Sequence, residues 1–167
     1  SVSYAAGAAH IYTMEQAMSN TNVLFAGTAT AGVWKTNNKG LNWESVTDTL
    51  AIGSVVALEI NHLNESTVYF GGGTHVYKTY NGGNNWEITG DAAFQMLDVW
   101  CNDLVMDPTD TSRLFIASNI GLFVSIDGGN NFSLVLNGEI QELEFHPSNP
   151  SIIYLVRQIG NKTEFHK

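Results

Sequence analysis

The sequence is poor in cysteine, in basic residues and in long apolar runs, and each deficit excludes a class of protein. A single cysteine, Cys101, excludes an internal disulfide. Seven Lys and Arg against 16 Asp and Glu give a formal net charge of −9, which argues against nucleic acid and anionic membranes as partners. No run approaches the length of a membrane-spanning helix, so no membrane insertion is expected.

The composition that remains is typical of a folded, turn-rich β protein. Apolar residues make up 44% of the chain and charged residues only 14%, which excludes a disordered tail. The 16 glycines provide for many tight turns. We therefore expect an all-β fold with several short strands.

Three segments of the chain repeat one pattern, which is Ser or Thr, any residue, Asp or Asn, any residue, Gly, any two residues and an aromatic. The segments are KTNNKGLNW, KTYNGGNNW and VSIDGGNNF, and their closing aromatics are 43 and 46 residues apart. A period of this size indicates a repeat architecture with one supersecondary unit per repeat. The residues at the four fixed positions, called the box residues below, are Thr36, Asn38, Gly40 and Trp43; Thr79, Asn81, Gly83 and Trp86; and Ser125, Asp127, Gly129 and Phe132.

Short apolar runs around each box predict four antiparallel strands per unit, which is the composition of a β-propeller blade. We expect blades at about residues 8–47, 53–90 and 100–136, and an incomplete one at 139–167. Fewer than four complete blades do not close a usual propeller. The chain is therefore interpreted as part of a larger propeller, completed by further blades or by another chain.

The box residues are explained by folding alone. The glycine allows a backbone conformation with positive φ, and the Asp or Asn side chain accepts hydrogen bonds from nearby backbone N–H groups. A calcium loop needs more carboxylates than the single Asp127 of the third box. In the turn that follows the first strand of each unit, His62 and His146 are expected at one equivalent position, with Asp107 in the third unit. No histidine has metal-ligand spacing, so neither a metal nor a cofactor is expected.

The box pattern on four-strand units resembles the Asp-box (BNR) repeat family, whose members include sialidases, xyloglucanases and sortilin. The stretch NTNVLFAGTATAGVWKTNNKGLNW is most similar to large secreted bacterial proteins with Asp-box repeats. The resemblance implies a propeller with its boxes on the face opposite the ligand site. It also implies a secreted or cell-surface location, most of all the bacterial outer surface.

A ligand site is expected on the other face, in the long connection at residues 89–100. Asp91, Phe94, Asp98 and Trp100 are its candidate ligand-binding residues, since an aromatic next to carboxylates suits a sugar or a protein contact. The alternative is that Phe94 and Trp100 close the gap between two blades.

Enzyme activity has weaker support in the sequence. Sialidases grip their substrate with three arginines, whereas this chain has only Arg113 and Arg157. A glycosidase needs two facing carboxylates, and nothing in the sequence pairs the loop candidates Asp48, Asp91, Asp98 and Glu139.

The sequence therefore predicts a non-catalytic binding or scaffold module for a protein or a glycan, and we assign no catalytic residue. Two alternatives stay open. One is a fragment of a polysaccharide-active glycoside hydrolase, and the other is an assembly factor that binds a specific protein.

Overall fold

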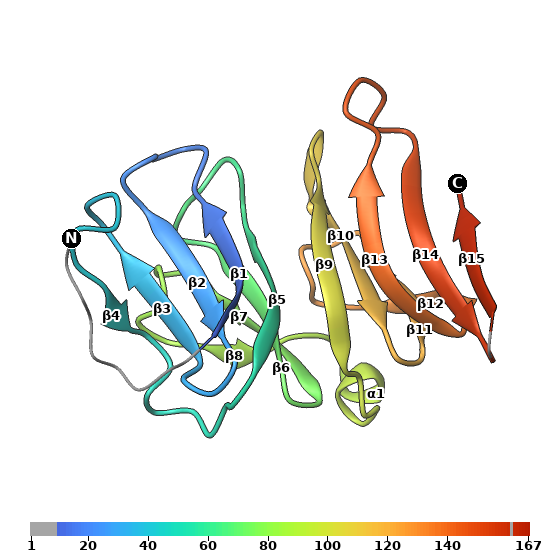
Figure 1. Cartoon of the computed structure of the whole chain (residues 1–167), viewed down its shortest axis with the longest axis horizontal. Helices are drawn as coiled ribbons and strands as arrows, with labels where there is room; N and C mark the ends of the chain where they lie inside the picture. Colours follow the sequence, from blue (N-terminus) through green and yellow to red (C-terminus); the bar gives the residue numbers. More distant parts are fainter. Residues whose placement is uncertain (1–9, 161) are drawn as a thin grey trace.

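The computed structural model describes residues 10–160 and 162–167, and its strands form four antiparallel sheets (Figure 1). Residues 8 and 9, the start of the first predicted unit, lie outside the described residues. The first sheet contains β1 (Ile11–Gln16), β2 (Leu24–Thr28), β3 (Val33–Thr36) and β4 (Glu44–Ser45), and the second contains β5 (Val55–Ile60), β6 (Val68–Gly72), β7 (His75–Thr79) and β8 (Glu87–Ile88). The third sheet contains β9 (Cys101–Asp107), β10 (Asp110–Ser118), β11 (Gly121–Ser125) and β12 (Ser133–Asn137), and the fourth contains β13 (Glu139–Phe145), β14 (Ile153–Ile159) and β15 (Lys162–His166).

Strand order within each sheet follows the chain, because every strand is joined to the next by a short turn. The first strands β1, β5, β9 and β13 contact one another in series, and they are called the inner strands below. Figure 1 shows them toward the middle of the molecule, with β4 and β15 at opposite margins. The all-β, four-strand prediction is confirmed.

The hydrophobic core lies between sheets, in separate clusters. Phe25 and Val33 of the first sheet pack with Val55 and Phe70 of the second. A second cluster joins the second sheet to the third, and a third cluster joins the third to the fourth. Because each sheet buries its faces only against its neighbours, the fold depends on stacking, as in other repeat proteins.

The three boxes form the same turn. In the second, Thr79 Oγ1 donates to Asn81 Oδ1 at 2.9 Å and accepts from the backbone N–H of Gly83 at 3.1 Å. Asn81 Oδ1 also accepts from the N–H of Asn85. Gly83 has φ of 92°, a conformation that favours glycine. The boxes that begin at Thr36 and Ser125 repeat these hydrogen bonds.

Replacing Thr79 with Ala is expected to lower the free energy of unfolding by about 2 kcal/mol, because the buried N–H of Gly83 loses its acceptor. Thr79→Ser keeps the hydroxyl, which Ser125 supplies in the third box, and is expected to stay within about 0.5 kcal/mol of the parent. Urea denaturation of the three proteins measures the difference. Equal losses for Ala and Ser would show that the methyl group matters and the hydroxyl does not.

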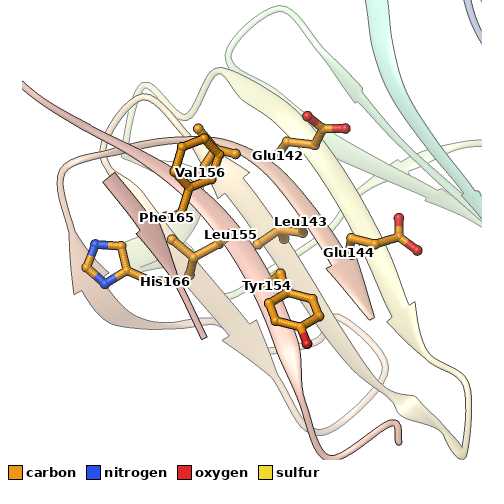
Figure 2. Close-up of a pocket in the computed structure, with 8 residues that line it drawn as sticks. All are labelled: Glu142, Leu143, Glu144, Tyr154, Leu155, Val156, Phe165 and His166. Carbon is orange, nitrogen blue, oxygen red and sulfur yellow. The ribbon is translucent and has the colours of Figure 1, made fainter. Parts of the chain in front are cut away.

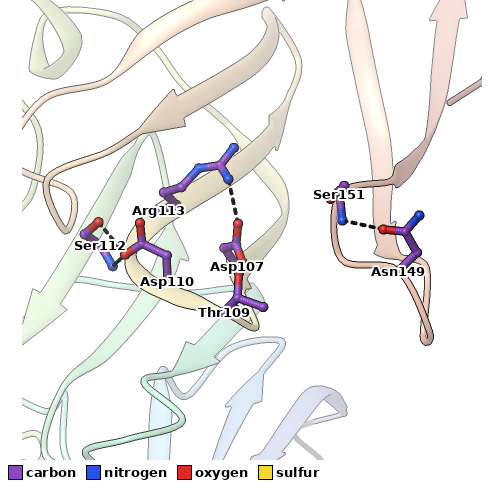
Figure 3. A network of polar contacts seen from close by, with 7 residues as sticks. All are labelled: Asp107, Thr109, Asp110, Ser112, Arg113, Asn149 and Ser151. Atoms are coloured by element: carbon purple, nitrogen blue, oxygen red, sulfur yellow. Dashed lines mark hydrogen bonds and ion pairs between the residues drawn. The ribbon is translucent and has the colours of Figure 1, made fainter.

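The turns after the inner strands also repeat (Figure 3). Asp110 and Asn149 each accept from the backbone N–H two residues later, those of Ser112 and Ser151. Asp107 is buried and accepts from the N–H of Thr109 and from Arg113, both at 2.8 Å.

The prediction that His62 shares the position of His146 and Asp107 is wrong by one residue. Asn61 holds that position, since its Oδ1 accepts from the N–H two residues later, as Asp107 Oδ1 and His146 Nδ1 do. An amide, a carboxylate or an imidazole can fill the position because each offers an acceptor to the turn.

Two lysines link consecutive sheets. Lys35 Nζ donates to the carbonyl of Gly82, and Lys78 Nζ donates to that of Gly128 at 2.6 Å. Both lysines precede a box, and both reach the box of the next sheet. Lys78 is 4% exposed and lies over the rings of Tyr69 and Tyr80, so its charge is balanced by a carbonyl and two aromatic faces. Val124 occupies this position in the third sheet.

Candidate functional site

The connection between β8 and β9 contains one turn of helix, α1 (Ala92–Gln95). Asp91 caps it, with its carboxylate accepting from the N–H of Phe94 at 2.9 Å. Phe94 is 4% exposed, and its ring packs on Phe123 and on the box aromatic Phe132. These contacts place Asp91 in a structural role and Phe94 in the core between the second and third sheets, away from any surface ligand.

Trp100 has the opposite environment, because its side chain is 58% exposed. Its backbone is nevertheless held firmly by Asn119, in the short loop between β10 and β11. The N–H of Trp100 donates to Asn119 Oδ1 at 2.9 Å, and the N–H of Asn119 donates back to the Trp100 carbonyl. Asn119 Nδ2 also donates to the carbonyl of Asp98, whose side chain is exposed. An exposed aromatic ring is therefore carried on an ordered backbone.

Trp100 lines a hollow of about 420 Å³ between the second and third sheets, called the Trp100 hollow below. It lies where β5 and β9 begin and β6 ends, at the opposite end of the sheets from the boxes. Its walls carry no charged side chain and consist of Gly53, Ser54, Val56, Gly71, Gly73, Trp100, Cys101 and Asn102.

Glycine keeps part of this hollow open. A Cβ on Gly71 would lie 2.4 Å from Cys101 Cβ, so no larger residue fits there. A Cβ on Gly53 would meet nothing within 4 Å, and Gly53 does not have a positive φ. A larger side chain at Gly53 can therefore enter the space without backbone strain.

Further along the inner strands from the hollow lie the carboxylates of Glu15, Glu59 and Asp103, which are called the row below. The pKa of Glu59 is raised to about 8, mainly by burial and then by the nearby Glu15 and Asp103, while a backbone hydrogen bond from Met106 opposes the rise. Burial is also the main cause of the raised pKa values of Glu15 and Asp103. Asp103 accepts from the N–H of Leu143 at 2.9 Å, which links the third sheet to the fourth. The raised pKa values mean that the fold favours the protonated form of these three carboxylates.

A second hollow, of about 300 Å³, lies on the outer face of the fourth sheet (Figure 2). Glu144 and Tyr154 are cross-strand partners on this face. The equivalent partners are Glu59 and Tyr69 in the second sheet, and Glu15 and Phe25 in the first. In the first and second sheets, the equivalent face packs against the next sheet, to which Lys35 and Lys78 donate hydrogen bonds. The exposed Phe165, beside Val156, therefore lies on the face that corresponds to the packing faces of the earlier sheets.

The loop carboxylates considered for catalysis are not brought together by an interaction among the described residues. Asp48 accepts from Ser45 Oγ, and Asp91 caps α1. Within the described ranges, no group of three or more His, Cys, Asp or Glu is arranged to hold a metal ion. No helix in that part of the chain has the length and apolarity that a membrane crossing requires.

Sequence reasoning selected Trp100 but missed Asn119 and Gly53. The stretch SNIG indicates a short loop, but only the fold brings its Asn119 into contact with residues 98–100. The sequence also did not indicate that Phe94 and Trp100, six residues apart, have opposite exposures.

No protein-family model and no curated protein matches this chain. Solved structures do match. A GH74 enzyme of Niastella koreensis is 19% identical, with a TM-score of 0.72 over 88% of this chain and 26% of its own. The GH74 xyloglucanase of Xanthomonas campestris is 13% identical, with a TM-score of 0.72 over 91% of this chain and 27% of its own. YCF48 bound to a D1 peptide is 14% identical, with a TM-score of 0.66 over 95% of this chain and 51% of its own.

At these identities the likeness shows the fold alone. The chain spans about a quarter of the GH74 enzymes just named and about half of YCF48. These proteins are β-propellers, and their agreement with the four stacked antiparallel sheets supports one conclusion. The chain has the all-β fold of consecutive β-propeller blades.

Proposed function

We propose that this chain is a non-catalytic binding module, an Asp-box type propeller segment that contacts its partner through the Trp100 hollow. The observation that carries the proposal is the exposed ring of Trp100 on a backbone held by Asn119. Binding sites gather on loops that a rigid scaffold positions, and Trp is enriched among residues that dominate binding energy.

Further apolar residues are exposed, two of them near Trp100 in the chain and one in the wall of the hollow. Met96 is 86% exposed, and Leu97 and Val56 are exposed to a smaller degree. Exposed apolar groups around an aromatic anchor are characteristic of interaction surfaces. The backbone beside them is held by the hydrogen bonds of Asn119 with Asp98 and Trp100, which lowers the entropic cost of binding.

The comparisons support a binding role at the level of the fold. One matched structure is YCF48 with a bound peptide, and another is the extracellular domain of a putative hybrid two-component system of B. thetaiotaomicron, at 15% identity and a TM-score of 0.63. We propose a secreted or cell-surface location on the same basis. We further propose that additional blades, or another chain, pack on the outer face of the fourth sheet.

A second candidate is a fragment of a polysaccharide-active glycoside hydrolase. It is favoured by the GH74 neighbours and by the exposed Asp98, which lies two residues from Trp100. A glycosidase requires a second carboxylate facing the first, and this would have to come from other blades.

Replacing Trp100 with Ala is expected to weaken binding at least about tenfold, because it removes the exposed ring from the hollow. Gly53→Leu is expected to weaken binding similarly by filling the space. A peptide library and a glycan array identify the ligand, and isothermal titration calorimetry gives the affinities.

The control is Leu63→Ala, which removes an exposed apolar side chain in the turn after β5, at the other end of the sheet. Unchanged binding in Trp100→Ala would exclude the hollow as the site. Hydrolysis of a polysaccharide by the parent chain, lost in Asp98→Asn, would instead support the glycoside hydrolase.

A further inference from the structure

We propose that the partner of the Trp100 hollow is a basic peptide, which places an apolar side chain against Trp100 and Lys or Arg beside the carboxylates of β5 and β9. This inference rests on the proposed function and specifies its ligand. Two independent features of the structure carry it, the uncharged walls of the hollow and the charge of the strands that lead from it.

The hollow itself suits an apolar side chain. Trp100 and Val56 supply its apolar side chains, and three glycines leave room between them. Of the polar side chains in its wall, Asn102 already donates its amide to the carbonyl of Ile140 at 2.8 Å. Few groups remain to bind the hydroxyls of a sugar, so an aliphatic or aromatic anchor fits better.

The inner strands carry charge of one sign. Their carboxylates are Glu15, Glu59, Asp103, Asp107, Glu139, Glu142 and Glu144, and no Lys or Arg lies in β1, β5, β9 or β13. Asp107 is paired with Arg113, but Glu15 and Glu59 have no ion pair in the described part of the chain. At a pH above the pKa of Glu59, a cationic ligand would therefore meet Glu15 and Glu59 as charges that no ion pair of the described residues neutralises.

The Trp100 hollow and the carboxylates of Glu59 and Asp103 are close enough for one short peptide to contact both. Asn102 lines the hollow, and Asp103 follows it directly in β9. Val56 lines the hollow, and Glu59 is three residues further along β5, about 10 Å at the rise of a strand. An extended peptide spans that distance with about three residues, so an anchor flanked by cations matches the spacing.

The charge pattern selects a peptide over the other macromolecules. Nucleic acids are repelled by the carboxylates, and a neutral glycan carries no cation that would compensate their charge. A peptide with Lys or Arg on both sides of a Leu or Phe uses the hollow and the row together.

Fluorescence polarisation with a labelled peptide, one Phe flanked on each side by Lys and Arg, tests the proposal. Affinity at pH 8.5 is expected to fall at least about tenfold between about 50 mM and about 500 mM sodium chloride. Trp100→Ala is expected to cost at least about tenfold at either salt concentration. Glu59→Gln is expected to weaken binding about threefold or more at low salt only.

Two controls separate charge position from net charge. Glu87→Gln removes one negative charge, as Glu59→Gln does, but from an exposed position on the outer strand β8. It is expected to leave the affinity unchanged. A peptide with Glu in place of Lys and Arg is expected not to bind. Because the pKa of Glu59 is raised to about 8, affinity for the basic peptide is also expected to rise between pH 6.5 and pH 9.

Equal binding of the acidic and basic peptides would overturn this inference. So would a neutral glycan that binds in a Trp100-dependent, salt-independent manner, although that result would support the proposed function. A lack of dependence on Trp100 for every bound ligand would overturn both proposals.

Discussion

The free energy of unfolding is expected to fall as the pH rises from about 5 to about 8, and Glu59→Gln is expected to remove most of this fall. The folded protein raises the pKa of Glu59 from 4.5 to about 8 through burial, then through Glu15 and Asp103. Below pH 4.5 the folded and unfolded chains both hold the proton. Between the two pKa values only the folded chain holds it, so stability is lost as the pH rises through this window.

The expected loss is on the order of 2–4 kcal/mol, since each pKa unit corresponds to about 1.4 kcal/mol and the inner edge is partly solvated. Urea denaturation at several pH values measures it, with Glu87→Gln as the control. Asp127 acts in another window, because its pKa is lowered to about 2 by Asn131 and its contribution is lost only below about pH 4. A flat pH profile from 5 to 8 in the parent protein would contradict the prediction.

Replacing Trp86 with Ala is expected to lower the free energy of unfolding by about 3 kcal/mol. This box aromatic lies edge-on to Phe70 with ring centroids 4.7 Å apart. Its Nε1 donates to the carbonyl of Val46 in the preceding sheet at 2.9 Å. The substitution removes a large apolar contact and leaves that carbonyl without its donor. Thermal and urea denaturation measure the loss.

Trp43 is the matched control, because it holds the same box position in the first sheet. No hydrogen bond from its indole nitrogen to a preceding sheet exists in the described ranges. Trp43→Ala is therefore expected to cost about 1 kcal/mol, a third of the loss at Trp86. Equal losses would mean that the box aromatics stabilise their own turns rather than the joint between sheets.

The two results together distinguish apolar contacts from electrostatic effects as forces that hold neighbouring sheets together. Trp86 acts near the outer strands through apolar contact and one hydrogen bond, and Glu59 acts at the inner edge through charge. Because Trp86 bonds to Val46 beside the first sheet and Glu59 to Met106 of the third, the two sites share no partner, and their effects on stability should be nearly additive in a double variant.

The all-β architecture and the order of the strands follow from patterns in the sequence alone. The box spacing located the repeats, and the apolar runs located strands such as Val68–Gly72 and His75–Thr79 as the structure has them. These features are local, because a turn needs glycine and an acceptor at fixed positions and a strand needs apolar residues in succession. A local pattern can also be wrong by one residue, because it assigns His62 to the turn position that Asn61 holds.

Whether an aromatic or charged side chain is exposed or packs against another sheet depends on the tertiary structure. Phe94 and Trp100 share one connection and are both aromatic, but Phe94 is in the core, whereas Trp100 is exposed on a backbone that is hydrogen-bonded to Asn119. Lys78 and Glu59 are ordinary charged residues in the sequence. Their burial, and with it the pKa of Glu59, arises only when neighbouring sheets stack and remove water from between them.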